Sequence, residues 1–423
     1  MCDTLYAGPS MAADGKAWFA KNSDRDPREP QAFCLVPQRP EAEAILVGKR
    51  VFPGPDRGYA FALSKPSWIS GGEMGLNEKG VAIGNEAVFS RWKPDKDGAL
   101  GMDILRAALS FAPTAKEALD YIAAYVEHFS QGGNGAYKGR LYYDNSFIIA
   151  DYEEAYILET AGRRWAWRKI DDFATISNAY GIETDYKRLD AQTRMEIAPV
   201  NPRAACSDEA EPGRVGERGS WKAWVEKRFY LRFTKGETRR ACTAAALEAA
   251  RGRMGLGAML AALRVHGKYD PRRRGSMASP CMHSGGFPVS NATTASAAVE
   301  YDRAKGRAVL WFSASSYPCV SLYKPLLLVG GEFFPLWTKY DYAEDSAEAY
   351  GQWERQREWL GKAKAGALSL EPAFVERRDA AQGRLEKAVA ALGPGIPRPE
   401  SLEAARREVD AAVAEWLSGL EGY

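Results

Sequence analysis

Short apolar segments alternating with polar turns dominate the first third of the chain. Residues 2–7 and 16–21 are both strand-like, and the loop between them ends in Asp14-Gly15, a dipeptide typical of β-hairpins. A second turn at 77–80 precedes an apolar run that extends to Asn85. The pattern therefore predicts antiparallel strands at the start of the chain, with the first two joined as a hairpin.

The apolar positions take on a helical period between Asp103 and Phe129. Pro113 divides this region into two helices, because proline has no amide hydrogen to continue a helix. Thr114 and Glu117 form a capping-box pattern just before the second apolar run. We therefore expect one helix to end near Pro113 and another to begin after Thr114.

Four strand-like runs follow at 146–151, 155–160, 164–170 and 173–178, and their short turns predict an antiparallel meander. Residues 185–275 are mixed and lean towards helix, with a polar stretch near 207–219. Strands resume at 293–301, 307–315 and 324–330.

The chain changes character after about residue 338, where Ala, Glu and Arg dominate. The period there is helical over 344–392 and 400–419, with a break rich in proline and glycine at 393–399. We expect a main domain over 2–335, in which 185–275 shapes the pocket, and a helical C-terminal extension over 340–423. The order of strands, helices, strands and helical tail predicts an α+β protein with antiparallel sheets and helices packed outside them.

Charge and hydropathy exclude several classes of partner. The 57 Lys and Arg residues nearly balance the 55 Asp and Glu residues, so the net charge is +2. This balance gives no basic surface for nucleic acid or an anionic membrane. We see no signal peptide and no apolar run long enough to span a bilayer, which takes roughly 18 residues. We expect a cytoplasmic protein that binds neither nucleic acid nor membrane.

Metal and cofactor sites are not indicated by spacing. The six cysteines are scattered without a Cys-x-x-Cys pair, and the three histidines form no His-x-x-x-His pair. Cys281 and His283 are the nearest approach to a ligand pair, and the glycine-rich segment 132–139 lacks the spacing of a phosphate loop. We expect reduced thiols, a flexible turn at 132–139, no cofactor and no metal.

The predicted hairpin gives Cys2 a particular neighbourhood. Pairing of 2–7 with 16–21 places Cys2 beside Asn22, Ser23 and Asp24. The unperturbed pKa values of an α-amine and a thiol are about 8 and about 8.5, so a proton can pass between them near neutrality. If Met1 is removed, Cys2 carries both nucleophile and base. The alternative is that Cys2 is a small apolar residue at a frayed terminus.

Several segments together resemble the dipeptidase/secernin family of N-terminal-nucleophile (Ntn) hydrolases. They are MCDTLYA, FAKNSDRDPREPQ, PSWISGGEMGLNEKGVAIGNEAV, GMDILRAAL, SQGGNG, NSFIIADYEEAYILETAGRRWAW, ISNAYGI, CMHSGGFPVSNATTASAAV and SSYPCVSLYKP. The likeness is dense from residue 2 to about 182 and resumes near 281. It implies an αββα sandwich, with two stacked antiparallel sheets between helical layers, which agrees with the order of elements above.

The resemblance also implies roles for individual residues. Cys2 takes the position of the nucleophile, and its α-amine that of the base. Asp24 takes the position that contacts the terminal amine, and Lys21 stands where wider relatives carry an arginine. Asn85 and Asn178 match positions that supply oxyanion contacts.

Each of these residues also has an ordinary structural interpretation. Asn85 and Asn178 can simply close strand ends, and Asp24 can cap a turn. Glu73 and Glu86 lie at strand ends near the presumed site, where either could receive a substrate ammonium, although such residues are more often solvated or paired.

Three functions follow from this interpretation. The first is a dipeptidase that hydrolyses small peptides through an acyl-thioester on Cys2. The second is an acylase of the same fold that acts on N-acyl amides. The third is a non-catalytic, secernin-like scaffold whose helical tail binds partners, set against a tail that packs on its own sandwich or on a second subunit of a homo-oligomer.

Overall fold

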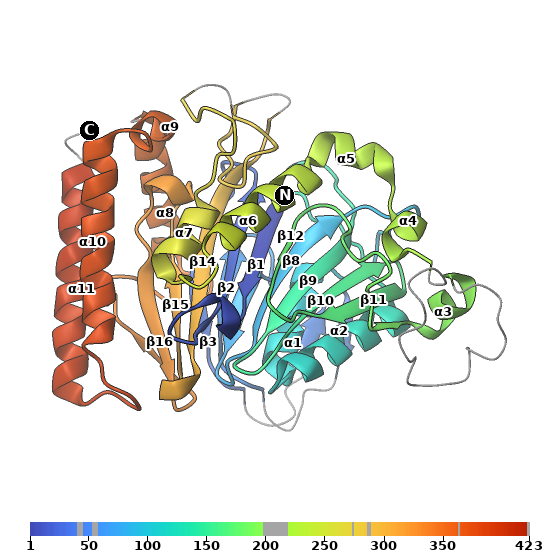
Figure 1. Ribbon diagram of the computed structural model, residues 1–423, viewed down its shortest axis with the longest axis horizontal. Coiled ribbons are helices and arrows are strands. Elements are labelled where there is room, and N and C mark those ends of the chain that lie inside the picture. The colour runs from blue at the N-terminus through green and yellow to red at the C-terminus, as the bar shows by residue number, and fades with distance from the viewer. Residues whose placement is uncertain are drawn as a thin grey trace.

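The computed structural model describes residues 1–39, 45–52, 58–197, 219–272, 275–285, 289–362 and 364–420. Two antiparallel sheets lie face to face, with helices on both outer faces (Figure 1). The predicted α+β class, with two antiparallel sheets between helical layers and helices at the C-terminal end, is confirmed. The predicted polar stretch at 207–219 lies outside the described residues except for Gly219.

The first sheet has seven strands and contains the predicted hairpin. In spatial order the strands are β12 (Phe173–Ile176), β1 (Cys2–Ala7), β2 (Ala17–Arg25), β14 (Ala292–Asp302), β15 (Arg307–Phe312), β16 (Lys324–Val329) and β17 (Glu332–Pro335). Cys2 lies opposite Ser23 in the β1–β2 register, so the predicted neighbourhood of Cys2 is confirmed.

The second sheet has eight strands, and a separate pair, β4 (Ile45–Val47) and β5 (Arg50–Phe52), lies outside it. The eight strands are β13 (Arg188–Leu189), β11 (Arg164–Lys169), β10 (Ala155–Ala161), β9 (Asp144–Ala150), β8 (Ala82–Val88), β7 (Met74–Asn77), β6 (Phe61–Pro66) and β3 (Gln31–Val36). Phe147 and Ile149 of β9 belong to the apolar cluster shared with the helices below the sheet, whereas Ile148 packs between the sheets. Both faces of β9 are therefore buried, which accounts for its nearly continuous apolar sequence.

The predicted four-strand meander is wrong in its last strand. β9, β10 and β11 pair in order, but β12 crosses to the first sheet and pairs with β1. The free edge of β11 is taken by β13, through Ala166 and Leu189. A period of two residues identifies a strand but not its partner, so the sequence pattern could not reveal this crossing.

Two helices cover the outer face of the second sheet. α1 (Gly101–Phe111) and α2 (Ala115–Phe129) are separated at Pro113 as predicted. Thr114 caps α2, because its hydroxyl accepts a hydrogen bond of 3.1 Å from the backbone N–H of Glu117.

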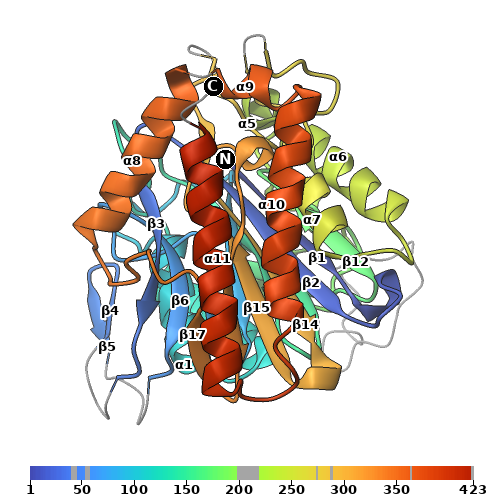
Figure 2. The same ribbon diagram turned by 90° about the vertical axis from the view of Figure 1, so that its left-hand side faces the viewer.

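Helices within 236–263 and 372–420 cover the outer face of the first sheet (Figure 2). The remaining helices are α3 (Ala191–Ile197), α4 (Trp221–Val225), α5 (Arg228–Thr234), α6 (Gly236–Ala249), α7 (Leu256–Leu263), α8 (Ala347–Lys362), α9 (Ala365–Leu368), α10 (Pro372–Ala390) and α11 (Pro399–Leu420), with 3-10 turns at η1 (Pro9–Met11), η2 (Arg303–Lys305) and η3 (Pro318–Val320). Leu385 of α10 and Trp416 of α11 belong to the same apolar cluster as Leu5 of β1. Among the described residues, no helix is both long and apolar enough to cross a membrane.

Candidate active site

Cys2 lies at the floor of a cavity of about 330 Å³. The side chain is only 5% exposed and starts β1, so strand pairing fixes its position. Asp24, Glu73 and Asn85 line the same cavity, together with Met1. The structure therefore brings Cys2 together with three of the residues that the sequence singled out.

The Cys2 thiol lies in a buried, charged environment. Its Sγ is 3.5 Å from Oε2 of Glu73. Burial, with a smaller contribution from Glu73, raises the pKa of the thiol to about 12, while Lys21 and the terminal ammonium act in the opposite direction. With Met1 attached, the thiol is therefore protonated at neutral pH.

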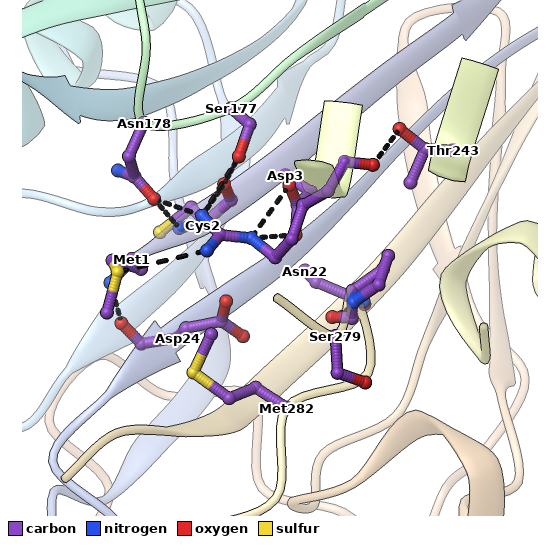
Figure 3. Close-up of polar contacts among 12 residues, drawn as sticks. Met1, Cys2, Asp3, Asn22, Asp24, Ser177, Asn178, Thr243, Ser279 and Met282 are labelled. Carbon is purple, nitrogen blue, oxygen red and sulfur yellow. Dashed lines mark hydrogen bonds and ion pairs between the residues drawn. The ribbon is translucent and has the colours of Figure 1, made fainter. Parts of the chain in front are cut away.

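The backbone of Cys2 is held by residues at the end of β12. Its N–H donates a 2.9 Å hydrogen bond to Oδ1 of Asn178, and its carbonyl accepts one of 3.2 Å from the Ser177 hydroxyl (Figure 3). The Asn178 amide group donates to the Ala87 carbonyl at 2.7 Å. The oxygen of Asn178 thus faces the nitrogen of Cys2.

Asp24 lies on β2 next to the chain terminus. The ammonium of Met1 donates to the backbone carbonyl of Asp24, and Oδ1 of Asp24 accepts a 2.6 Å hydrogen bond from Thr293. Oδ2 is buried and has no hydrogen-bond partner in the described part of the chain. Burial raises the pKa of Asp24 to about 7, although the terminal ammonium lowers it. A carboxylate with an unsatisfied oxygen therefore lies beside the terminus.

Glu73 and Glu86 lie in different environments, and neither is solvated. Oε1 of Glu73 accepts a hydrogen bond from Arg25; burial would raise the pKa of Glu73, but Arg25 and Lys21 hold it below the usual value. Glu86 is paired with Lys21 at 3.1 Å and accepts a hydrogen bond from Thr4. Only Glu73 of the two lines the cavity.

Lys21 lies between the two glutamates. Its Nζ is fully buried, donates to the carbonyl of Asn85 and is 3.8 Å from Oε2 of Glu73. It therefore places a positive charge near the Cys2 thiol from beneath the cavity floor. Asn85 itself lines the cavity, and its amide group donates a 3.0 Å hydrogen bond to Asn145.

Arg239 of α6 is a site residue that the sequence analysis missed. It is fully buried and donates to Asp3 at 3.0 Å, to Ser177 at 2.9 Å and to Oδ1 of Asn178. It also contacts the Cys2 carbonyl at 3.4 Å. One arginine in a mixed helical region carries no sequence signal, because its partners are far away along the chain.

The glycine-rich segment is the second feature that was missed. Residues 135–138 and 140–141 line the cavity, a role that the sequence analysis did not assign to the turn predicted at 132–139. Arg25 donates a 2.9 Å hydrogen bond to the carbonyl of Gly135, which attaches this wall to β2. Lys138 and Arg140 are exposed, so they place two positive charges at the rim.

Comparison with solved structures yields distant similarities. No protein-family profile matches the chain. A mutant of the conjugated bile acid hydrolase from Clostridium perfringens is 12% identical, with 81% of this chain and 98% of that chain covered and a TM-score of 0.44. A second variant of that hydrolase is 13% identical, with coverages of 74% and 88% and a TM-score of 0.41. A Caenorhabditis elegans ortholog of N-acylethanolamine-hydrolyzing acid amidase is 11% identical, with coverages of 70% and 91% and a TM-score of 0.34.

Proposed function

We propose that this chain is an Ntn amide hydrolase of the dipeptidase/secernin type, with Cys2 as its nucleophile. The observation that carries the proposal is the position of Cys2, whose thiol lies at the floor of the cavity while its nitrogen is held at 2.9 Å by Asn178. Nucleophile and potential base thus belong to one residue, fixed at the start of a paired strand. The proposal requires removal of Met1, which lines the same cavity.

Loss of Met1 converts the amide nitrogen of Cys2 into an amine. An ammonium on the same residue favours the thiolate, because an opposite charge within a few ångströms lowers a thiol pKa. Lys21 acts in the same direction. In this proposal Asn178 orients the amine, and Asp24, whose Oδ2 lies unsatisfied beside the terminus, stabilises its charged form.

The proposed reaction passes through a thioester. The amine takes the thiol proton, the sulfur attacks the carbonyl carbon, and the resulting oxyanion accepts a hydrogen bond from the amide group of Asn85. As the C–N bond breaks, the ammonium returns its proton to the leaving nitrogen. Water then adds to the thioester, losing a proton to the amine, which restores the Cys2 thiol and releases the acid. One oxyanion donor is worth about 3 kcal/mol of transition-state stabilisation.

The charges around the cavity favour a dipeptide over an N-acyl amide. In a dipeptide the ammonium is one carbon away from the scissile carbonyl, and Glu73 lies 3.5 Å from the Cys2 sulfur, where such an ammonium would sit. The substrate carboxylate lies on the leaving side and would meet Lys138 and Arg140 at the rim. An acyl chain would instead need a predominantly apolar wall.

The direct test compares the full-length chain with Cys2→Ala on a panel of dipeptides, their N-acetylated forms and their C-terminal amides. We expect hydrolysis only by the unsubstituted chain and only of substrates with a free amine. Intact-mass analysis should show an active species that begins at Cys2. Full activity with Met1 in place, or equal turnover by Cys2→Ala, would contradict the mechanism. Preference for the acetylated substrates would favour the acylase.

A second test addresses the rim. Replacing Lys138 and Arg140 together by alanine should raise KM for free dipeptides at least about tenfold, since each charge-assisted hydrogen bond is worth about 1.5–3 kcal/mol. The rise should disappear with amidated substrates. Arg163→Ala removes an exposed arginine on the turn between β10 and β11 and serves as the control. An equal change in KM for free and amidated substrates would remove the rim from carboxylate binding.

A further inference from the structure

Four metal-ligating side chains converge at one end of the first sheet, and we call them the Cys-His cluster. They are His266, Cys281, His283 and Cys319, and their ligand atoms all lie within 4.8 Å of one another. They come from three segments, namely the loop after α7, the segment that precedes β14, and η3. The sequence analysis noted Cys281 and His283 but predicted no metal, because the other two residues of the cluster are far from this pair in the chain.

Three distances within the Cys-His cluster, all measured from Nε2 of His283, are close to those of a tetrahedral metal site. With bonds of about 2.0–2.1 Å to nitrogen and about 2.3 Å to sulfur, a tetrahedral zinc ion separates two nitrogens by about 3.3 Å and a nitrogen and a sulfur by about 3.6 Å. The Nε2 atoms of His266 and His283 are 3.3 Å apart, and Nε2 of His283 is 3.6 Å from Sγ of Cys281. Nε2 of His283 is 3.2 Å from Sγ of Cys319, which is somewhat shorter.

Hydrogen bonding alone accounts poorly for this arrangement. An imidazole nitrogen carries either one proton or one lone pair, so it makes one hydrogen bond. Three ligand atoms nevertheless lie within 3.6 Å of Nε2 of His283. A single cation shared by all four side chains would satisfy every one of them.

The surroundings hold the ligands in place. Cys281, His283 and Cys319 are buried, and the His283 ring stacks on Tyr317 with centroids 4.5 Å apart. The backbone N–H of Cys281 donates to the Val265 carbonyl at 2.9 Å, which joins two of the three segments. A cavity of about 380 Å³ is lined by two of the four ligands, His266 and Cys319.

We propose that the Cys-His cluster binds one zinc ion. Two thiolates and two neutral imidazoles are a ligand set of structural zinc sites, and four protein ligands leave no open position for catalysis. The ion would tie together three loops, one of which supplies the Pro280 carbonyl that accepts a 2.9 Å hydrogen bond from Asn22, two residues from Asp24. The site is thus a structural support for the strand beside Cys2, and it stands whether or not the proposed hydrolase activity does.

The test uses the full-length chain and the metal alone. After dialysis against metal-free buffer we expect about one zinc per chain by elemental analysis. Chelator-stripped protein should take up one equivalent of zinc chloride, and its melting temperature should rise by at least about 5 °C. Cobalt chloride should give the thiolate-to-cobalt charge-transfer band of a tetrahedral site.

Two variants and a control locate the ion. Cys281→Ser and Cys319→Ser should each abolish stoichiometric zinc uptake, whereas Cys242→Ser, which alters a half-buried thiol outside the cluster, should retain it. If either serine variant fails to fold, the cobalt spectrum of the unsubstituted chain still decides. A stripped, folded chain that takes up no zinc and shows no cobalt–thiolate band would overturn the proposal, as would a Cys281–Cys319 disulfide in freshly purified protein.

Discussion

Replacement of Arg239 by methionine is expected to lower the free energy of unfolding by about 3–5 kcal/mol, the cost of removing one partner from a buried ion pair. Arg239 and Asp3 both have fully buried side chains, and Nε of Arg239 is 3.0 Å from Oδ2 of Asp3. Methionine preserves most of the volume but leaves the Asp3 carboxylate without its cation. The carbonyls of Thr234 and Met277 lose a donor in the same step.

The measurement is urea unfolding followed by tryptophan fluorescence and far-UV circular dichroism. Coincident transitions justify a two-state fit, from which the midpoint and slope give the free energy. Arg251→Met is the matched control, because Arg251 is likewise ion-paired, with Asp172 and Glu248, but is 41% exposed. Exposed pairs contribute about 0–1 kcal/mol, so this variant should remain close to the unsubstituted chain.

A double-mutant cycle separates the ion pair from the other contacts of Arg239. Asp3→Asn combined with Arg239→Met should cost less than the sum of the single changes, by a coupling of about 0.5–3 kcal/mol. If the two effects simply add, or if Arg239→Met costs no more than Arg251→Met, the ion pair between Arg239 and Asp3 does not stabilise β1.

Three further predictions concern other contacts. Gly236→Ala should lower kcat/KM at least about tenfold, which corresponds to about 1.4 kcal/mol of transition-state stabilisation, because the added methyl carbon would lie 2.6 Å from the backbone of Asn178. The control is Gly257→Ala, which should leave activity unchanged because the space around Gly257 is open. Burial raises the pKa of Glu86 to about 7, so between about pH 4 and 7 the folded chain holds a proton on Glu86 that the unfolded chain has lost, and the free energy of unfolding should fall as pH rises through this window. The slope of unfolding free energy against pH should be smaller in Glu86→Gln. An equal slope would exclude Glu86 as the source. Thr114→Ala should cost about 1 kcal/mol through loss of the α2 cap, with Thr114→Ser close to neutral in the same urea assay.

Local patterns predicted the parts of the site that depend on neighbours in the chain. The β1–β2 hairpin places Cys2 opposite Ser23, and two-residue alternation and a turn dipeptide were sufficient to predict this neighbourhood, although not the register itself. The break at Pro113 and the cap at Thr114 depend on residues a few positions apart and were likewise predicted correctly.

The missed features all depend on contacts between distant segments. The pairing of β12 with β1, the contacts of Arg239 with Asp3, and the Cys-His cluster each join residues from separate parts of the chain. Their residue types are ordinary at their own positions, and only the folded chain brings them together. For the same reason the sequence did not show that the glycine-rich segment near Gly135 forms a wall of the cavity, where Arg25 of β2 binds it.

Because β1 lies between β2 and β12, the pocket around Cys2 can form only late in the synthesis of the chain. Cys2 contacts Asn178 and Arg239, which are 176 and 237 positions away, so the pocket closes only after both have left the ribosome. At roughly 5–20 residues per second this takes about 10–50 s after the first residues emerge. Before β12 emerges, the amino terminus lacks this partner strand, and a methionine aminopeptidase can reach Met1. Once β12 and α6 have docked, Met1 is partly buried in the wall of the cavity, so we expect removal of Met1 to be faster before docking than after it.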